Sequence, residues 1–284
     1  MAIAISRSIS NVSVPTYVGG TSIVPKVCGY DANNSKDSTS VSIHEESQAL
    51  RTSLTAYQLR LISAWEFNET SAGVFNVPRA DSRGLNHLTD NNSTPSASGL
   101  ASGDALAARF VSGNFNFFSR TAGTITGIEG KTGDFAIETH FKLNSVGVIQ
   151  TLIAKGATAN NIAGFWVFVS ATNRLQLNIG NGTARVTLNP ATTLSVSTNY
   201  HLVLNCDRDG NAEFFLNNSS IGSISIASIP GGLGSSTDLT IGQTSGVTYL
   251  SADVSYVRFW DGLLDATDRT YLRNSGNLKE YSQL

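Results

Sequence analysis

The chain has 284 residues, with 19 lysine and arginine residues against 21 aspartate and glutamate residues, so its formal net charge is −2. Charged residues make up only 14% of the sequence, and no stripe of basic residues is present. Because nucleic-acid binding depends on such a stripe, we exclude a nucleic acid as the expected partner. No apolar run reaches the roughly 18 residues that a membrane span requires, so we expect no membrane partner.

The first 58 residues differ from the rest. Residues 8–40 are a mixture of Ser, Thr, Asn, Gly and Pro with isolated apolar pairs, which is too little apolar material for a core. We therefore expect residues 1–58 to be an extended arm that orders only against a partner. Helical spacing of apolar residues predicts one short helix over about residues 46–58. This helix is either a linker packed on the next domain or a docking or oligomerisation element.

From residue 59 onward, short apolar runs recur at intervals of about 8–12 residues between turn residues, which predicts an all-β sandwich. The clearest predicted strands are 61–67, 105–111, 134–143, 148–155, 164–170, 174–179, 184–188, 199–206, 211–217, 237–242 and 251–260. Near the C-terminus, Asp265 and Asp268 have the spacing of a helix cap, and Gly276 can end the helix. The expected fold over residues 59–284 is a two-sheet antiparallel jelly roll with one short C-terminal helix.

Alternation within the strands separates an apolar face from a polar one. In residues 134–143, Phe135, Ile137, Phe141 and Leu143 share one face, and Glu138, His140 and Lys142 share the other. Two later strands alternate in the same way. We therefore expect one sheet with a half-wet outer face on which a ligand can lie. The candidate ligand-binding residues are Glu138, His140, Trp166, Gln176 and His201.

Several motifs follow one another in an order that resembles a known family. They are SAWEF at 63–67, DSRGLN at 81–86, GDALAARF at 103–110, GDFAIETHFK at 133–142, DGNAEFFLN at 209–217 and SADVSYVRFW at 251–260. Together they resemble a laminin G-like, concanavalin A-like jelly-roll domain over about residues 60–284. The resemblance implies a binding module for sugars, proteins or lipids, although related sandwiches include glucan hydrolases.

A catalytic role is not expected. Glycosidases hold two carboxylates at a fixed separation, and no Glu-x-Asp-x-Glu pattern occurs in the sequence. The nearest strand pattern is Glu138-x-His140-x-Lys142, which is either a proton-transfer site or a solvated sheet face. We expect the chain not to be an enzyme, with no catalytic residues.

A bound calcium ion is the one cofactor that we consider, because related sandwiches join their first and last strands with one. Calcium binds carboxylate and carbonyl oxygens. Glu66 and Asp253, on strands that resemble the family's first and last, and Asp81, in an oxygen-rich loop, are the candidate ligands. The alternative for these residues is ordinary turn capping.

Two functions of different class remain. The first is a structural or adhesive protein of a bacteriophage-type particle, such as a capsid decoration protein or a fibre or tail adhesin. Residues 1–58 would then dock on other virion or assembly proteins, and the sandwich would project from the virion surface. The second is a calcium-assisted carbohydrate-binding lectin module, either free or appended to an enzyme. The expected location is the virion surface or the extracellular space. In either case we expect a homo-oligomer, with a glycan as the candidate ligand.

Overall fold

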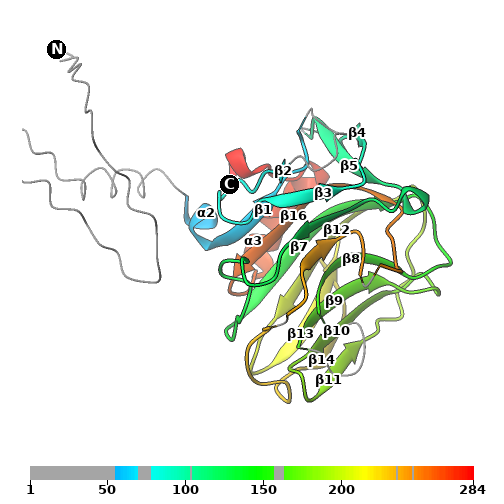
Figure 1. Ribbon diagram of the computed structural model, residues 1–284. Coiled ribbons are helices and arrows are strands. Elements are labelled where there is room, and N and C mark those ends of the chain that lie inside the picture. Colours follow the sequence, from blue (N-terminus) through cyan, green and yellow to red (C-terminus); the bar gives the residue numbers. More distant parts are fainter. Residues whose placement is uncertain (1–54, 70–77, 103, 157–162, 235, 245) are drawn as a thin grey trace, which may run out of the picture. The chain divides into compact units, whose positions relative to one another are not determined.

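The computed structural model describes residues 55–69, 78–102, 104–156, 163–234, 236–244 and 246–284. The predicted arm and most of the helix predicted over 46–58 lie outside these ranges. Residues 55–284 group into one unit by their contacts. In the part of the chain that the structure describes, sixteen strands form two antiparallel sheets of eight strands each, so the predicted all-β sandwich is confirmed (Figure 1).

The first sheet has the order β14-β13-β12-β7-β16-β5-β4, with β1 also paired to β16. Its strands are β1 (Leu61–Trp65), β4 (Ser96–Ser98), β5 (Leu106–Phe110), β7 (Phe135–Leu143), β12 (Asn199–Cys206), β13 (Asn211–Leu216), β14 (Ser219–Ser225) and β16 (Ala252–Asp261). The long central strands β7 and β16 pair along most of their length, with a bulge between Val254 and Tyr256.

The second sheet has the order β11-β10-β9-β8-β15-β6-β3-β2. Its strands are β2 (Pro78–Arg79), β3 (Leu88–Asn91), β6 (Phe117–Arg120), β8 (Gln150–Lys155), β9 (Gly164–Val169), β10 (Leu175–Gly180), β11 (Arg185–Leu188) and β15 (Leu239–Ile241). Each strand predicted from the sequence overlaps an observed one. Sequence reasoning missed β2, β3, β4, β6 and β14, which are short or rich in polar residues.

The core fills the space between the two sheets with the apolar side chains that alternation predicts for one face of each strand. Phe135 of β7 stacks on Phe259 of β16, with ring centroids 5.1 Å apart, and meets Phe165 of β9 from the opposite sheet at 6.0 Å. All three rings are fully buried. Burying an aromatic side chain of this size stabilises the fold by roughly 1.5–3 kcal/mol, so these inner faces hold the two sheets together.

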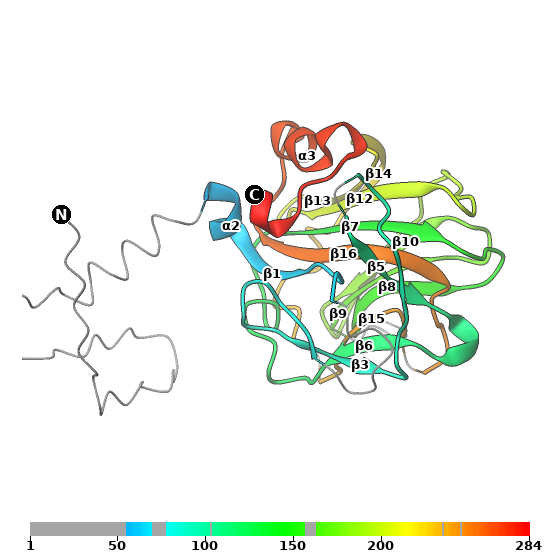
Figure 2. The ribbon, with the colours of Figure 1, turned by 90° about the horizontal axis from the view of Figure 1, so that it is seen from above.

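A second, smaller apolar cluster covers the outer face of the first sheet. Helix α2 (Ala56–Arg60), helix α3 (Ala266–Arg273) and the 3₁₀ turn Tyr281–Gln283 pack there against Trp260, Ala136 and Val203. A further 3₁₀ turn, Asn274–Gly276, follows α3. Figure 2 shows α3 beside β12 and β13, away from β6 and β3. We call α2, α3 and the residues that follow α3 the cap.

Polar contacts and aromatic stacking join the two ends of the cap. The ring of Tyr57 in α2 stacks on that of Tyr271 in α3, with centroids 4.5 Å apart, and Arg60 pairs with Asp268 at 2.8 Å. Thr55 and Asp265 each begin their helix with a reciprocal capping box, which satisfies backbone N–H groups that a helix start leaves unpaired. The predicted cap at Asp265 and Asp268 is therefore confirmed. Helix α3 ends at Arg273, where Asn274 adopts a left-handed conformation, three residues before the predicted stop at Gly276.

Candidate functional site

The outer face of the second sheet carries no helix in the described part of the chain. Strand pairing places one row of outward side chains across this face, from β3 to β11: Thr89, Ser119, Thr240, Ala154, Trp166, Asn178 and Thr187. The row contains hydroxyl, amide and indole groups but no charge. We call this surface the open face.

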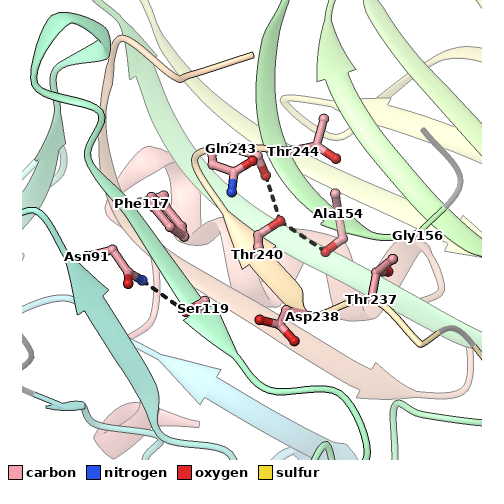
Figure 3. Close-up of a pocket in the computed structure, with 10 residues that line it drawn as sticks. All are labelled: Asn91, Phe117, Ser119, Ala154, Gly156, Thr237, Asp238, Thr240, Gln243 and Thr244. Atoms are coloured by element: carbon pink, nitrogen blue, oxygen red, sulfur yellow. Dashed lines mark hydrogen bonds between the residues drawn. The ribbon is translucent and has the colours of Figure 1, made fainter. Parts of the chain in front are cut away.

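A pocket of about 350 Å³ lies on the open face, over β3, β6, β15 and β8 (Figure 3). Figure 3 shows Thr240 in its middle, Asn91 and Phe117 on one side, and Ala154 and Gly156 on the other. The lining residues are Asn91, Phe117, Ser119, Ala154, Gly156, Thr237, Asp238, Thr240, Gln243 and Thr244. This volume falls at the small end of the roughly 300–1,000 Å³ typical of ligand pockets.

Hydrogen bonds hold the polar groups of the pocket in place. The Asn91 side-chain amide donates to Ser119 Oγ at 2.9 Å, and the Thr240 hydroxyl donates to the Gln243 carbonyl at 2.6 Å. Gln243 Oε1 accepts from the Gly246 N–H at 2.8 Å. Because an amide carries both donors and acceptors, Asn91 and Gln243 keep further hydrogen-bonding capacity for a ligand.

The pocket also has one acidic group and one apolar wall. Asp238 is exposed at the rim, where its Oδ1 accepts a hydrogen bond from the Ala122 N–H at 3.0 Å. The half-buried ring of Phe117 forms the wall beside Asn91. Among the described lining residues Asp238 is the only charged one, so the pocket favours neutral or cationic ligands over anionic ones.

The structure divides the five predicted ligand-binding residues between the two sheets. Trp166 and Gln176 belong to β9 and β10 of the open face, where Phe168 sits opposite Gln176. Trp166 is only 8% exposed, since its ring stacks on that of Phe168 with centroids 3.8 Å apart and its Nε1 donates to Thr151 Oγ1. Neither Trp166 nor Gln176 lines the pocket.

Glu138, His140 and His201 lie instead on β7 and β12 of the first sheet, where His140 Nδ1 is 3.8 Å from Asp104 Oδ2 in the loop between β4 and β5. Their exposed fractions are 0%, 4% and 3%, so the predicted wet outer face is wrong at these positions. Alternation correctly directs these side chains away from the core, but it carries no information on what packs over them. The solvated-face interpretation of Glu138 and His140 fails for the same reason.

Glu138 is the centre of a buried polar network. Its carboxylate accepts hydrogen bonds from His201 Nε2 at 3.0 Å, Tyr256 Oη at 2.8 Å and Trp260 Nε1 at 3.0 Å. Arg258 Nη1 lies 3.5 Å away. Burial alone would raise the pKa of Glu138, but Arg258 and His201 outweigh burial and lower this pKa to about 2. Glu138 is therefore an ionised structural group with its accepting capacity occupied.

The three predicted calcium ligands lie in three separate interaction sets. Glu66 binds Arg258 through both carboxylate oxygens, and burial raises the pKa of Glu66 in spite of that cation. Asp81 accepts four backbone N–H groups of its own loop and of β1. Asp253 contacts Arg109 and Lys142. The structure does not bring these carboxylates together. Asp81 accepts from its own loop, as the turn-capping alternative expects, whereas Glu66 and Asp253 are in ion pairs.

Another acidic group, which sequence reasoning missed, can supply metal ligands. Carboxylate oxygens of Asp134, Asp207 and Asp209 lie within 4.8 Å of one another, before β7 and in the turn between β12 and β13. A hydrogen bond with Asp209 raises the pKa of Asp207. Hard cations such as calcium prefer oxygen ligands of this kind, although exposed acidic groups also occur together without any ion.

Comparison with known proteins gives one family and one fold. The sequence model of the concanavalin A-like lectin/glucanases superfamily, laminin G type, matches residues 119–268. No curated protein sequence matches the chain.

Solved structures share the fold at low sequence identity. The binding domain of Paraclostridial Mosquitocidal Protein 1 is 12% identical with a TM-score of 0.61, covering 78% of this chain and 53% of its own. The binding domain of botulinum neurotoxin DC, solved in complex with rat synaptotagmin II, is 14% identical with a TM-score of 0.55, covering 77% and 52%. A structure of botulinum neurotoxin type C, whose cell entry depends on two ganglioside molecules, is 13% identical with a TM-score of 0.53, covering 77% and 52%. The match thus spans about half the length of each of these structures, and at such identities the likeness concerns the fold.

Proposed function

The chain belongs to the concanavalin A-like lectin/glucanases superfamily, and we propose that it is a non-catalytic binding module that holds a carbohydrate on its open face. The observation that carries this proposal is the pocket over Thr240, where neutral hydrogen-bonding groups face an aromatic ring. A sugar presents hydroxyl groups around its edge and C–H groups on its faces. Asn91, Gln243 and Asp238 suit the hydroxyl groups, and Phe117 suits a C–H face.

The distribution of acidic groups supports binding over hydrolysis. A glycosidase needs two carboxylates, about 5–5.5 Å or 6.5–9.5 Å apart, on either side of the bond that it cleaves. Among the described residues that line the pocket, Asp238 is the only carboxylate. The other carboxylate that sequence reasoning weighed for catalysis, Glu138, is enclosed on the opposite face of the sandwich.

The fold relatives are consistent with this proposal. Two of them are binding domains, one of which is in complex with rat synaptotagmin II, and the third is from a toxin whose cell entry depends on gangliosides. Gangliosides carry acidic sugars, whereas the pocket of this chain carries an acidic group of its own. We therefore propose neutral or amino sugars as its ligands. Trp166 and Gln176, on the neighbouring strands, stay predictions as further contacts.

A glycan array with the full chain tests the proposal. We expect binding to neutral glycans, a loss of about five- to tenfold in affinity for Asp238→Asn, a loss of about two- to tenfold for Asn91→Ala, and no change for Asp261→Asn. Asp238→Asn replaces a charge-assisted hydrogen bond by a neutral one, which is weaker by about 1 kcal/mol, and Asn91→Ala removes neutral amide hydrogen bonds worth about 0.5–1.5 kcal/mol. Asp261 is an exposed acidic residue outside the pocket and serves as the matched control. An array with no bound glycan would contradict the proposal.

Calcium assistance is tested in the same experiment by adding a chelator. The Asp134, Asp207 and Asp209 group is the place where we would look for the ion. Binding that is unchanged by the chelator would remove calcium from the proposal and leave the pocket intact.

The attachment role of residues 1–58 extends the proposal. Helix α2, the first described element, packs on the covered side of the sandwich, through Tyr57 and Arg60. The chain thus enters the domain on the side opposite the open face, an arrangement that suits a module held at one side and binding at the other. We propose such a module on a phage-type virion or another extracellular assembly, as a homo-oligomer.

Limited proteolysis tests the attachment role. If residues 1–45 are removed rapidly in the isolated protein but protected in the assembly with which it purifies, the docking role gains support. An arm that resists protease in the isolated monomer would contradict it. Electron microscopy of that assembly then identifies a virion or another particle.

A further inference from the structure

An aromatic ridge continues the pocket wall outward over the surface. Phe117, which lines the pocket, faces the ring of Tyr249 with centroids 6.3 Å apart. Tyr249 in turn meets the ring of Phe115 edge to face at 5.0 Å. Phe115 is 55% exposed, whereas the phenylalanines of the described core are buried. We call Phe115, Phe117 and Tyr249 the ridge.

The backbone around Phe115 fixes its ring in this exposed position. Phe115 follows the 3₁₀ turn Ser112–Asn114 and has φ 57° and ψ 34°, a left-handed conformation that is unfavourable for a bulky residue. Two hydrogen bonds of nearby asparagines hold it there. Asn92 Nδ2 donates to the Phe115 carbonyl at 2.8 Å, and Asn116 Nδ2 donates to the Asn92 carbonyl.

Strain that surrounding contacts maintain is a feature of functional sites. Here the left-handed backbone of Phe115 keeps an apolar ring exposed to solvent, whereas most phenylalanine rings of the described residues are buried in the core. The loop therefore presents Phe115 instead of packing it.

We propose that the ridge is a second subsite, in which Phe115 and Tyr249 stack on the C–H face of the next sugar ring of an oligosaccharide whose first ring occupies the pocket. This inference rests on the proposed function. The pocket, at about 350 Å³, is at the small end for a ligand site, so additional sugar units must extend out of it. The ridge begins at Phe117 inside the pocket and supplies the adjoining surface.

The neighbours of Phe115 favour a sugar over a lipid bilayer. Asn114, exposed, and Asn116, buried, flank it in the sequence, and Gly113 is also exposed. A segment that inserts into a bilayer presents contiguous apolar side chains, whereas this turn presents one exposed ring beside the exposed Asn114. An amide beside an aromatic ring matches a ligand that has hydroxyl groups around an apolar face.

Calorimetric titration of the full chain separates the two subsites. The probes are the neutral oligosaccharide with the strongest array signal, its component monosaccharides, and vesicles of phosphatidylcholine. For Phe115→Ala we expect a loss of about three- to tenfold in affinity for the oligosaccharide, the range of one aromatic contact, and unchanged affinity for the monosaccharide. Phe115→Tyr keeps the ring and is expected to retain binding. Val196→Ala removes another exposed apolar side chain, outside the ridge, and is the matched control.

The outcomes distinguish failure of the second subsite from failure of the proposed function. Equal oligosaccharide affinity in wild type and Phe115→Ala, together with a loss in Asp238→Asn, overturns the second subsite and leaves the pocket standing. No oligosaccharide binding by the wild type overturns both. Vesicle binding that requires Phe115 overturns the sugar subsite in favour of a bilayer. The thermal midpoint of each variant, expected to match that of the wild type within a few degrees, excludes unfolding as the cause.

Discussion

The two outer faces of the sandwich carry polar side chains at equivalent alternate positions, yet they differ in charge and in cover. On the first sheet, Glu138, Arg258 and His201 are buried beneath the cap with their partners. On the second sheet, Ser119, Thr240 and Asn178 lie in a row that no described helix covers. The covered face thus uses ionised groups internally for structure, and the open face offers neutral groups outward for a ligand.

Charge and burial together explain this difference. A buried ionised group is tolerated only when other groups compensate it, and Glu138 accepts three hydrogen bonds and lies beside the Arg258 guanidinium. Uncharged hydroxyl and amide groups need no such network to face water. A polar residue at an outward position of a strand is therefore a candidate for ligand binding only where no other part of the chain packs over it.

The largest expected effect comes from breaking the network under the cap. Arg258→Met leaves Glu66 and Glu138 buried without their shared cation, so we expect the free energy of unfolding to fall by about 3–5 kcal/mol. Urea denaturation measures it. Arg185→Met, at an exposed position on β11, is the control and is expected to change stability by less than ~0.5 kcal/mol. If the two substitutions lowered the free energy of unfolding equally, the covered face would not depend on buried ionised groups more than the open face does.

The next effect is acid sensitivity. An unfolded glutamate has a pKa of about 4.3, and the folded pKa of Glu138 is lowered to about 2. The stabilisation by ionised Glu138 is therefore complete above about pH 5 and is lost as the pH falls toward 2, by about 3 kcal/mol in all. Denaturation at several pH values should show this loss in the wild type and not in Glu138→Gln. Glu66, whose pKa is raised by burial, acts in the opposite direction in both proteins. If the free energy of unfolding of the wild type and of Glu138→Gln varied with pH in the same way, the network would not lower the pKa of Glu138.

The smallest expected effect on stability is that of a substitution on the open face, Asp238→Asn. Asp238→Asn retains the oxygen that accepts from the Ala122 N–H, so we expect the free energy of unfolding to stay within ~0.5 kcal/mol of the wild type. A scanning calorimeter measures this directly. A loss of 2 kcal/mol or more would mean that Asp238 serves the fold, and any accompanying loss of binding would no longer indicate a ligand contact.

Much of the fold follows from local patterns in the sequence. Strong apolar alternation located β7, β12 and β16 within about one residue, and the Asp265–Asp268 spacing located the start of α3. Strands such as β14, with the sequence SSIGSIS, and β3, with LTDN, form because neighbouring strands pair with them. Their own residues lack the apolar pattern, so sequence reasoning had no signal for them.

The candidate site could be predicted only in part. Alternation identified the outward direction of Glu138 and Trp166, but the sheet to which each strand belongs depends on long-range pairing. Asn91, Ser119 and Asp238 meet in the pocket although they are up to about 150 residues apart in the chain. A single Asp, Asn or Ser in a turn-rich sequence has no distinguishing local signal, and these residues therefore emerge only from the folded structure.

A crystal structure of the full chain with the neutral oligosaccharide selected on the array is the sharpest test of sugar binding on the open face. We expect density for the first sugar ring between Asn91 and Asp238, above Thr240, with the second ring against Phe115 and Tyr249. Density beside Asp134 and Asp209, or on the cap, with an empty pocket over Thr240, would contradict the assignment of binding to the open face.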